Sequence, residues 1–504
     1  MTLAPSTADV PPETWASTGI AGLDDVLHGG LTPERLYLVE GMPGSGKTTL
    51  ALQFLSAGAR RGESVLHISL SESEQELRAM AGGHGWSLDG ITIRELVTTD
   101  EVSAQDDRYT MFHPAEVELV ETTRRIMADI EAARPTRVVL DSLSEFLLLT
   151  GGSLHFRRQI LVLKRFFMSR RCTVLLLDDL TTAERNMLVQ SVVHGVFRLE
   201  QLSPEYGAQR RRLQVRKLRG KTFRGGYHDY TIVRGGLAVF PRLVSSEHKQ
   251  PGVLERFPSQ VAELDLMLGG GLERGTSTLV VGAPGTGKST LSSLFAAAAA
   301  AKGENAAFFI FDESEHTLIS RVEALGVPLG RYVREGRVVI RHIDPAELSP
   351  GEFAHAIRES VERERAAVVI IDSLNGYLNA MPEERFLVAQ LHEVLAYLGQ
   401  RHVVTILVGA QHGLLGMNMR SPVDASYLAD AIILMRYYEA AGELRQAISV
   451  IKKRGGDHER TIRDFRLADG RIQVGKPLRR YRGVLSGIPV DEGDVPRRDG
   501  WPDP

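Results

Sequence analysis

The sequence carries the same phosphate-binding pattern twice. Residues 41–48 (GMPGSGKT) and 282–289 (GAPGTGKS) both read G-x-x-x-x-G-K-[ST]. In such a loop, backbone N–H groups surround phosphate oxygens at the N-terminus of a helix. The lysine reaches the β and γ phosphates, and the next hydroxyl is a ligand of Mg²⁺. The pattern predicts ATP-binding residues at Gly44, Ser45, Gly46, Lys47, Thr48 and Thr49, and at Gly285, Thr286, Gly287, Lys288, Ser289 and Thr290.

The two loops belong to a longer repeat. Lys288 lies 241 positions after Lys47, and the same offset relates residues 29–31 (GGL) to 270–272 and residues 72–74 (ESE) to 313–315. A glycine–lysine turn can also begin an ordinary helix, but here the expected strand, loop and helix recur in the same order. The repeat therefore indicates a duplicated nucleotide-binding module.

The segments around the loops predict the fold. Continuous apolar runs at 36–40 and 278–281 enter the loops, and further runs follow at 65–69, 138–141 and 173–177 and at 306–311, 368–372 and 403–408. Amphipathic helices are expected near 115–133 and 351–365. Unalternated apolar strands separated by helices are typical of a parallel sheet covered on both faces. We expect an α/β protein of two tandem P-loop NTPase domains, each a mostly parallel, doubly wound sheet.

Carboxylates follow the predicted strands. Asp141 and Asp372 each end a buried strand, where a carboxylate can hold Mg²⁺ directly or through water, although an aspartate also suits a simple turn. Glu72 and Glu313 follow the second strand of each copy. They could orient or deprotonate an attacking water, or be ordinary exposed glutamates. Their recurrence in both copies favours the catalytic interpretation.

A basic strand lies near the end of each copy. Lys217 and Arg219 correspond to Lys452 and Arg454, 235 positions later. Alternation along a strand places both charges on one face. Three interpretations stay open: a nucleic-acid stripe, an edge-strand device against aggregation, and a cationic finger that completes a neighbouring subunit's ATP site.

Composition bounds the protein class. The chain has 504 residues, is 43% hydrophobic and has a formal charge of −3, so it can fill two cores and has no general attraction to nucleic acid or anionic lipid. Its single cysteine, Cys172, excludes an internal disulfide framework and is expected to be a buried thiol. No apolar run reaches the roughly 20 residues of a membrane span. The N-terminus lacks a signal pattern, so a cytoplasmic location is expected.

Polar and proline-bearing segments suggest the domain boundaries. The stretch 245–251 is polar and ends in proline, and the chain after 487 has little apolar content. We predict an N-terminal arm at 1–16, a first domain at 17–245, a second at 252–486, and a flexible tail at 487–504.

The paired loops, the two basic strands and the chain endings together resemble the KaiC family. The first domain ends with Leu218-Arg219-Gly220 and 230–232 (YTI), and the second ends with the stretch from Ala431 to His458. Residues 484–489 (VLSGIP) look like the family's C-terminal segment. The resemblance covers about Thr18 to Pro489. It implies a homohexamer of double RecA-like rings, with ATP and Mg²⁺ between subunits. It also implies that the first domain hydrolyses ATP and that the second phosphorylates the protein's own hydroxyl side chains.

The resemblance also assigns residues. It implies nucleotide contacts in trans from Lys217, Leu218, Arg219, Lys452, Lys453, Arg454 and His458. Phe223 replaces the histidine of the first domain. The family's Glu-Glu pair is Ser71-Glu72 in the first copy, which leaves Glu72 as the only carboxylate, and Asp312-Glu313 in the second. The family's serine–threonine acceptor pair falls on Ser426 and Tyr427, which favours phosphorylation at Ser426 alone over a two-step cycle, although Ser426 could also be a plain polar residue.

The leading hypothesis is a Mg²⁺-dependent ATPase and serine/threonine autokinase that regulates signalling or timing. The resemblance suggests KaiB-like or histidine-kinase partners. One alternative is a signalling scaffold that ATP assembles with little turnover. Another is a DNA-dependent recombinase or helicase motor, which the near-neutral charge disfavours; neither nucleic acid nor membrane is expected as a partner.

Overall fold

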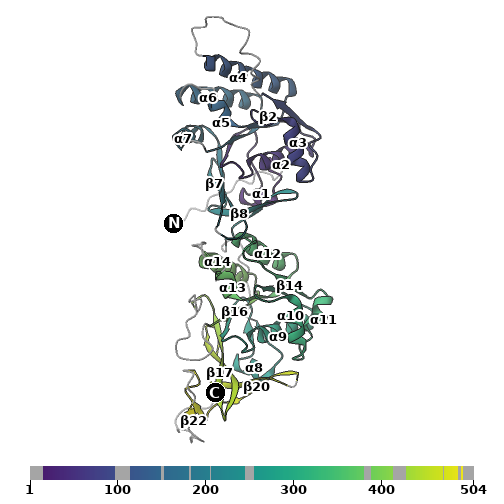
Figure 1. The fold of residues 1–504 in the computed structure, drawn as a ribbon, viewed down its shortest axis with the longest axis vertical. Helices are drawn as coiled ribbons and strands as arrows, with labels where there is room; N and C mark the ends of the chain where they lie inside the picture. Colours follow the sequence, from purple (N-terminus) through teal and green to yellow (C-terminus); the bar gives the residue numbers. More distant parts are fainter. Residues whose placement is uncertain are drawn as a thin grey trace, which may run out of the picture. The chain divides into compact units, whose positions relative to one another are not determined.

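The computed structural model describes residues 15–96, 114–148, 153–180, 183–204, 206–244, 255–379, 387–411, 427–468, 470–485 and 490–491. The chain separates into two compact units, Met1–Arg242 and Leu243–Pro504 (Figure 1). Ser426, nearly all of the predicted N-terminal arm and most of the predicted tail lie outside the described residues. Of the tail, Val490–Asp491 (β22) pairs with Tyr481–Arg482 (β21).

The first unit is built on a sheet with the strand order β3-β2-β4-β5-β1-β6-β7-β8-β9. Strands β3 to β6 in this order are parallel, and β7, β8 and β9 continue the sheet antiparallel. The strands are β1 Leu36–Gly41, β2 Val65–Ser69, β3 Ile91–Glu95, β4 Arg137–Asp141, β5 Thr173–Asp178, β6 Gly195–Leu202, β7 Arg210–Leu218, β8 Tyr227–Val233 and β9 Gly236–Phe240. The helices are α1 Ala21–Val26, α2 Lys47–Ala59, α3 Glu74–Gly83, α4 Pro114–Ala133, α5 Leu143–Leu148, α6 Ser153–Ser169 and α7 Ala183–Val192.

The second unit repeats this plan in the order β14-β13-β15-β16-β12-β17-β18-β19-β20. Its strands are β12 Ser277–Gly282, β13 Asn305–Ile310, β14 Val338–His342, β15 Ala366–Asp372, β16 Val404–Ala410, β17 Ala431–Ala440, β18 Glu443–Lys453, β19 Arg463–Ala468 and β20 Arg471–Pro477, with β10 Arg256–Phe257 and β11 Leu272–Glu273 as a separate pair. Its helices are α8 Ala262–Met267, α9 Lys288–Ala301, α10 Glu315–Glu323, α11 Leu329–Arg334, α12 Pro350–Glu362, α13 Leu374–Asn379 and α14 Leu387–Gln400.

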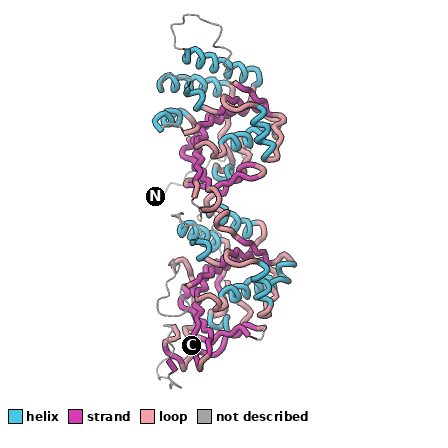
Figure 2. The backbone as a smooth tube through the Cα atoms, in the orientation of Figure 1, coloured by secondary structure: helices cyan, strands magenta, loops and turns pink. Residues whose placement is uncertain are grey.

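Helices cover both faces of each sheet (Figure 2). Along β1, Leu38 belongs to the core under α4 and α6, whereas Val39 belongs to the core under α2 and α3. Both faces exclude water, so the strands are apolar without alternation. The predicted doubly wound α/β fold is confirmed in both units.

The antiparallel extension carries the basic strands. β7 pairs with β6 and β18 with β17, and each pair contains a register shift beside the first basic residue. Lys217 pairs with Val196, and Val215 pairs with the next residue, Phe197, so β7 has one extra residue between them. In β18, Lys452 and Val450 likewise pair with two consecutive residues of β17 and have one extra residue between them. The extra residue forms a bulge that re-aims the end of the strand.

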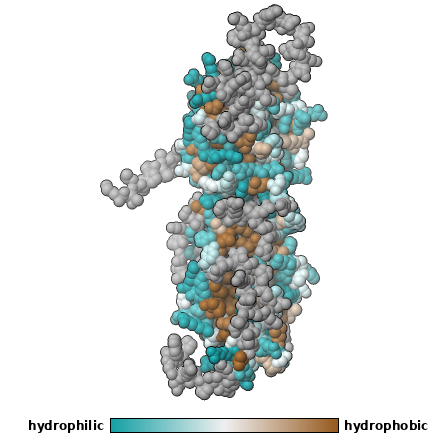
Figure 3. All heavy atoms as spheres, turned by 60° about the vertical axis from the view of Figure 1, so that its left-hand side comes forward, coloured by the Kyte–Doolittle hydropathy of each residue, from teal (hydrophilic) through white to brown (hydrophobic). Residues whose placement is uncertain are grey.

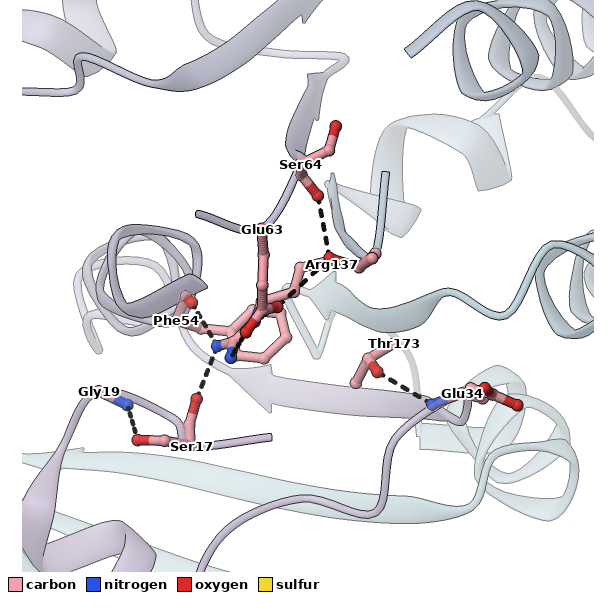
Figure 4. Close-up of polar contacts among 9 residues, drawn as sticks. Ser17, Gly19, Glu34, Phe54, Glu63, Ser64, Arg137 and Thr173 are labelled. Carbon is pink, nitrogen blue, oxygen red and sulfur yellow. Dashed lines mark hydrogen bonds and ion pairs between the residues drawn. The ribbon is translucent and has the colours of Figure 1, made fainter. Parts of the chain in front are cut away.

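A buried arginine ties together the amino ends of the first unit's strands (Figure 4). Arg137 begins β4 and is 1% exposed. Its Nε and Nη2 donate to the Glu63 carboxylate at 2.6 and 2.8 Å, and its Nη1 donates to the carbonyls of Ser17 (2.7 Å) and Phe54 (2.9 Å). Arg137 therefore fixes the chain entry and α2 to the sheet, away from the carboxyl ends where the loops lie.

The surface mixes polar and apolar side chains, and Figure 3 shows apolar patches in both units. Exposed apolar side chains include Leu161, Val162 and Met168 on α6, and Leu444 and Ile451 on β18. Among the described residues, no helix is both long enough and apolar enough to cross a membrane.

Candidate functional site

Each predicted loop joins a buried strand to a helix. β1 leads through the first loop into α2 at Lys47, and β12 leads through the second into α9 at Lys288. Gly46 and Gly287 precede the helices with φ of 89° and 95°, a conformation that strains other residues. A Cβ on Gly46 would lie 2.7 Å from Ile232, and one on Gly287 2.8 Å from Leu467. These glycines therefore let the chain turn so that the N–H groups of a helix N-terminus face the loop.

The other loop residues support the same turn. Gly44 and Gly285 have φ of 81° and 80°. The side chains of the remaining small polar residues are buried: Ser45, Thr49, Thr286 and Thr290. Thr286 Oγ1 donates to the Ala283 carbonyl at 2.8 Å, which closes the second loop on itself.

The two loop lysines differ in their partners. Lys47 Nζ donates to the carbonyls of Gly41 (2.9 Å) and Met42 (3.1 Å) and forms a 2.7 Å ion pair with Asp179. Lys288 Nζ donates to the Ala283 carbonyl at 2.8 Å, and burial lowers its pKa. Within the described parts of the chain, no carboxylate forms an ion pair with Lys288.

In the first unit, the predicted metal ligands meet directly. Thr48 Oγ1 donates to Asp141 Oδ2 at 2.9 Å, and so connects α2 to the end of β4. Burial raises the pKa of Asp141 to about 7; the Thr48 hydrogen bond acts in the opposite direction, and the charge of Glu72 raises the pKa further. The loop hydroxyl and the strand-end aspartate that the sequence offered as metal ligands therefore lie next to each other.

The second unit has the same pair in a more open form. Burial raises the pKa of Asp372 to about 6, while the Ser289 hydroxyl and the Lys288 charge act to lower it. Asp372 Oδ2 is buried and has no hydrogen-bond partner among the described residues. An orphaned carboxylate oxygen beside a loop hydroxyl leaves an acceptor for a cation.

These residues fit the ligand preferences of Mg²⁺. Mg²⁺ takes oxygen ligands and usually keeps waters and substrate phosphates beside one or two carboxylates. The described residues contain no group of three or more His, Cys, Asp or Glu side chains that could hold a metal without a nucleotide. Thr48 with Asp141, and Ser289 with Asp372, could hold Mg²⁺ together with phosphate oxygens and water.

Glu72 lies at the carboxyl end of β2, close to the first loop. Ser69 Oγ donates to the Glu72 carbonyl at 2.6 Å and accepts from the Glu72 N–H at 2.9 Å, which fixes the backbone. Burial raises the pKa of Glu72, and the charges of Glu76 and Asp179 raise it further while Lys47 opposes them. Ser71 is exposed, so Glu72 is the carboxylate that this turn places near the loop.

The equivalent turn of the second unit holds two carboxylates with different partners. Asp312 accepts a short hydrogen bond from Ser373, next to Asp372. Glu313 Oε1 is 2.6 Å from Arg321 Nη2 on α10, and Arg321 Nη1 lies 3.5 Å from Thr290 Oγ1. Arg321 therefore brings a positive charge to the loop that the sequence analysis did not single out.

The cations of the first basic strand contact their own chain. Lys217 Nζ donates to the carbonyls of Gln190 and Val193, the latter at 2.9 Å, and Arg219 Nη2 donates to the Ser191 carbonyl at 2.8 Å. Both charges lie against the C-terminal end of α7, where carbonyls attract cations. Leu218 packs against the core, and Phe223 packs beside it.

In the second unit the cations contact the segment that follows Ser426. Lys452 Nζ donates to the Ala429 carbonyl at 2.8 Å. Arg454 forms a 3.1 Å ion pair with Asp430 and donates to the Tyr427 carbonyl at 3.2 Å. The structure thus places the basic strand beside the predicted acceptor segment, while Ser426 itself is outside the described residues.

Two further residues assigned by the resemblance lie nearby. Lys453 is 4% exposed, donates to the Leu268 carbonyl at 2.6 Å and lies 3.6 Å from Glu273, so its ammonium is directed into its own unit. Burial lowers the pKa of His458, and the charges of Arg460 and Lys453 add to this effect.

Sequence reasoning missed two charged residues of the sites, Asp179 and Arg321. Asp179 follows Asp178, the last residue of the apolar strand β5, so it lies one residue beyond the position at which Asp141 was identified in β4. Arg321 could have been found by comparing the copies, because the equivalent residue at the 241-residue offset is Met80. At the 231-residue offset that relates Asp141 to Asp372, Asp179 corresponds to Ala410, so each of these two charges is present in only one copy.

The sequence model of the KaiC ATPase family matches residues 16–244 and 257–479, so both units are covered. The chain is 28% identical to the circadian clock protein KaiC3 of Synechocystis sp. over 495 residues, which is 96% of each chain. It is 27% identical to the circadian clock oscillator protein KaiC of Parathermosynechococcus lividus and of Synechococcus elongatus, in each case over 478 residues. Those matches cover 94% of this chain and 87% and 91% of the relatives. With two P-loop units that each match the family model, the chain belongs to the KaiC ATPase family.

Proposed function

We propose that the protein is a Mg²⁺-dependent ATPase and serine/threonine autokinase that works as a cytoplasmic double-ring homohexamer and regulates signalling or timing. The observation that carries this proposal is the hydroxyl–carboxylate pair beside each loop lysine, which is best seen in the 2.9 Å contact between Thr48 and Asp141. Phosphoryl transfer depends mainly on positioning and charge neutralisation, and these side chains could supply both.

Mg²⁺, held by Thr48 with Asp141 and by Ser289 with Asp372, would neutralise charge on the phosphates. The chain's own contribution is to hold the phosphates at helix N-termini and to present Lys47 and Lys288 to them. In hydrolysis, a water oxygen bonds to the γ phosphorus, the bond from that phosphorus to the β–γ bridging oxygen breaks, and ADP leaves. Glu72 or Glu313 would orient the water and accept its proton. The raised pKa of Glu72 suits a proton acceptor that works closer to neutral pH.

In the second unit, the Ser426 hydroxyl would replace water as the attacking group and would become a phosphoserine. Lys452 and Arg454 contact the residues immediately after Ser426, and the same cations are candidates to contact ATP. One basic strand could therefore position both the acceptor segment and the phosphates, which favours in-line transfer.

Assembly as a ring would place the basic strand of one subunit at the ATP of the next. Carbonyls at the end of α7 hold Lys217 and Arg219, and such contacts can be exchanged for phosphate oxygens. The exposed apolar side chains on α6 and β18 suit a contact surface. KaiB-like proteins or histidine kinases would be candidate partners that bind the ring.

Phosphopeptide analysis tests the proposal. The wild-type protein, incubated with Mg-ATP, should gain phosphate on the peptide that contains Ser426, and Ser426→Ala should lose it. Glu313→Gln should reduce incorporation by about 10²–10⁴-fold while ATP binding persists, because general-base catalysis contributes factors of that size. Glu72→Gln is the matched control, since it changes the same carboxylate in the other copy and should leave the second unit's phosphorylation intact.

Three outcomes would reject parts of this function. Unchanged phosphorylation in Ser426→Ala would refute the acceptor assignment. ATP-dependent assembly with neither turnover nor phosphoserine in the wild type would instead support the scaffold alternative. Turnover that requires DNA and falls steeply with salt would support a motor.

A further inference from the structure

We propose that Asp179 lowers the affinity of the first loop for ATP by competing with the phosphates for Lys47. The inference rests on the proposed function only in requiring that the first loop bind ATP; it does not depend on hydrolysis or on autophosphorylation. Asp179 would then set a difference in nucleotide affinity between the two copies.

The ion pair between Asp179 and Lys47 is built into the fold. Asp179 Oδ1 lies 2.7 Å from Lys47 Nζ, where the lysine is 7% and the aspartate 29% exposed. The Asp179 N–H donates to Ser144 Oγ at 3.0 Å, and Ser144 Oγ donates to Asp178 Oδ1 at 3.0 Å. The end of β5 is therefore held by α5, and the carboxylate is fixed at the loop.

The second copy lacks this carboxylate. Glu40 pairs with Asp178 across β1 and β5, and the equivalent Val281 pairs with Gly409 across β12 and β16. Asp179 therefore corresponds to Ala410. The Ala410 N–H donates to Asn375 Oδ1 at 2.8 Å, just as the Asp179 N–H donates to Ser144. The backbone arrangement at this position is the same in both units, but only the first unit has a carboxylate in contact with the loop lysine.

This difference acts on the atom that receives the phosphates. The loop lysine reaches the β and γ phosphates, so ATP must take Lys47 away from Asp179. The carboxylate that remains beside the γ phosphate then repels it, because like charges at close range disfavour each other. No such ion pair has to be broken at Lys288 among the residues that the structure describes. ATP should therefore bind the first loop more weakly than it would without Asp179.

The alternative is a structural role, in which Asp179 only keeps the Lys47 side chain extended before a nucleotide binds. The two roles differ in their effect on ADP. ADP lacks the γ phosphate, so relief of repulsion should improve ATP binding more than ADP binding. Loss of a structural support would instead weaken both nucleotides together.

Calorimetric titration of the full-length protein with ATP and with ADP tests the inference. A Lys288→Ala background silences the second loop. In that background, Asp179→Ala should lower the Kd for ATP by about tenfold and that for ADP by about threefold, as expected for removing a partly buried competing charge. Asp179→Asn should behave similarly and retains the side-chain volume. Ala410→Asp, in a Lys47→Ala background, should weaken ATP binding at the second loop.

Glu131→Ala is the control for net charge, because it removes one carboxylate from an exposed ion pair with Arg170 on the surface of the first unit. It should leave both affinities unchanged. Unchanged or weaker ATP binding in both Asp179 variants, or equal gains for ATP and ADP, would overturn the inference. Absence of ATP binding at the first loop in every variant would instead contradict the proposed function.

Discussion

At the scale of single residues, the two sites share the groups that we predict to bind phosphate but differ in the charged residues beside them. The first site adds a carboxylate, Asp179, next to its lysine. The second adds a guanidinium, Arg321, next to its glutamate. Electrostatic stabilisation depends on charges fixed near the reacting atoms. These two charged residues can therefore give two otherwise similar loops different nucleotide affinities and different rates of hydrolysis.

Arg321 provides a prediction for the second site. Arg321 Nη2 lies 2.6 Å from Glu313 Oε1, one of the two oxygens of the carboxylate that we propose accepts a proton from water. We expect Arg321→Met, which installs the residue found in the first copy, to raise the kcat for ATP hydrolysis at the second loop by about threefold to tenfold by freeing that oxygen. The KM for ATP should rise, because a positive charge near the phosphates is lost. Turnover is measured in a Lys47→Ala background.

The first copy offers the matched control for Arg321. Met80→Arg, in a Lys288→Ala background, should slow hydrolysis at the first loop, and Arg321→Lys should give values between Arg321→Met and the wild type. An unchanged kcat with a raised KM in Arg321→Met would show that Arg321 acts only in binding. A fall in kcat would show that Arg321 assists the transfer itself.

The sequence predicted the residues that belong to a contiguous motif or end an apolar strand. Both loop lysines, Thr48 and Asp141 follow from local patterns, and the pattern also implied that the last two would meet. The partner of Lys47 could not be predicted, because Asp179 is 132 positions away and is brought to the loop only by the strand order β4-β5-β1. Local chemistry identifies candidates, but the sheet decides which of them touch.

At the scale of elements, the sites depend on strands that end together at one edge of a parallel sheet. Glu40 pairs with Asp178 on one side of β1, and Ser69 pairs with Asp141 between β2 and β4. Buried apolar runs predicted these strands to within one or two residues. The three added antiparallel strands were not predicted in full, because β8, for example, alternates between buried and half-exposed residues and gives a weaker signal.

Arg137 provides a prediction for the element scale. Its side chain links β4 to Glu63 and to the carbonyls of Ser17 and Phe54. Arg137→Met keeps much of the volume but leaves these acceptors unpaired. We expect the first unit to lose about 2–3 kcal/mol, less than for a fully buried pair because Glu63 is 28% exposed and can be rehydrated.

Hydrogen exchange measures the effect of Arg137→Met on each unit separately. Amides in α2 and β4 should exchange faster, while those in α9 and β15 should not change. Arg94→Met is the control, because Arg94 forms an exposed 3.5 Å ion pair with Asp129 and should cost under about 0.5 kcal/mol. Equal changes in exchange rate for the two variants would show that the Arg137 side chain does not stabilise the first unit.

At the scale of the whole molecule, the question is whether a site is completed within one chain or between chains. In the described structure, Arg454 contacts Asp430 and Tyr427 of its own chain. In the proposed ring, it would instead contact the ATP held by the loop of the adjacent subunit. In the first arrangement Arg454 belongs to a site within its own chain, and in the second it belongs to the site of the adjacent chain. An experiment that mixes two variants distinguishes the two arrangements.

A mixing experiment provides the whole-molecule prediction. One variant carries Lys288→Ala and the other Arg454→Ala, both in a Lys47→Ala background, so that each alone lacks second-loop turnover. If Arg454 contacts the ATP of the adjacent subunit, a site needs Lys288 from one chain and Arg454 from the chain that precedes it in the ring. Random 1:1 rings with such head-to-tail contacts should then recover about one quarter of the turnover of the Lys47→Ala protein.

The control for mixing is a chain that carries Lys288→Ala and Arg454→Ala together, combined with the single variants. This chain supplies neither group, so mixtures with it should recover nothing. If Arg454 acts only within its own chain, every chain in the first mixture lacks one essential group and turnover also stays absent. Recovery near one quarter would therefore require a site shared between subunits, because no single chain in the mixture contains both Lys288 and Arg454.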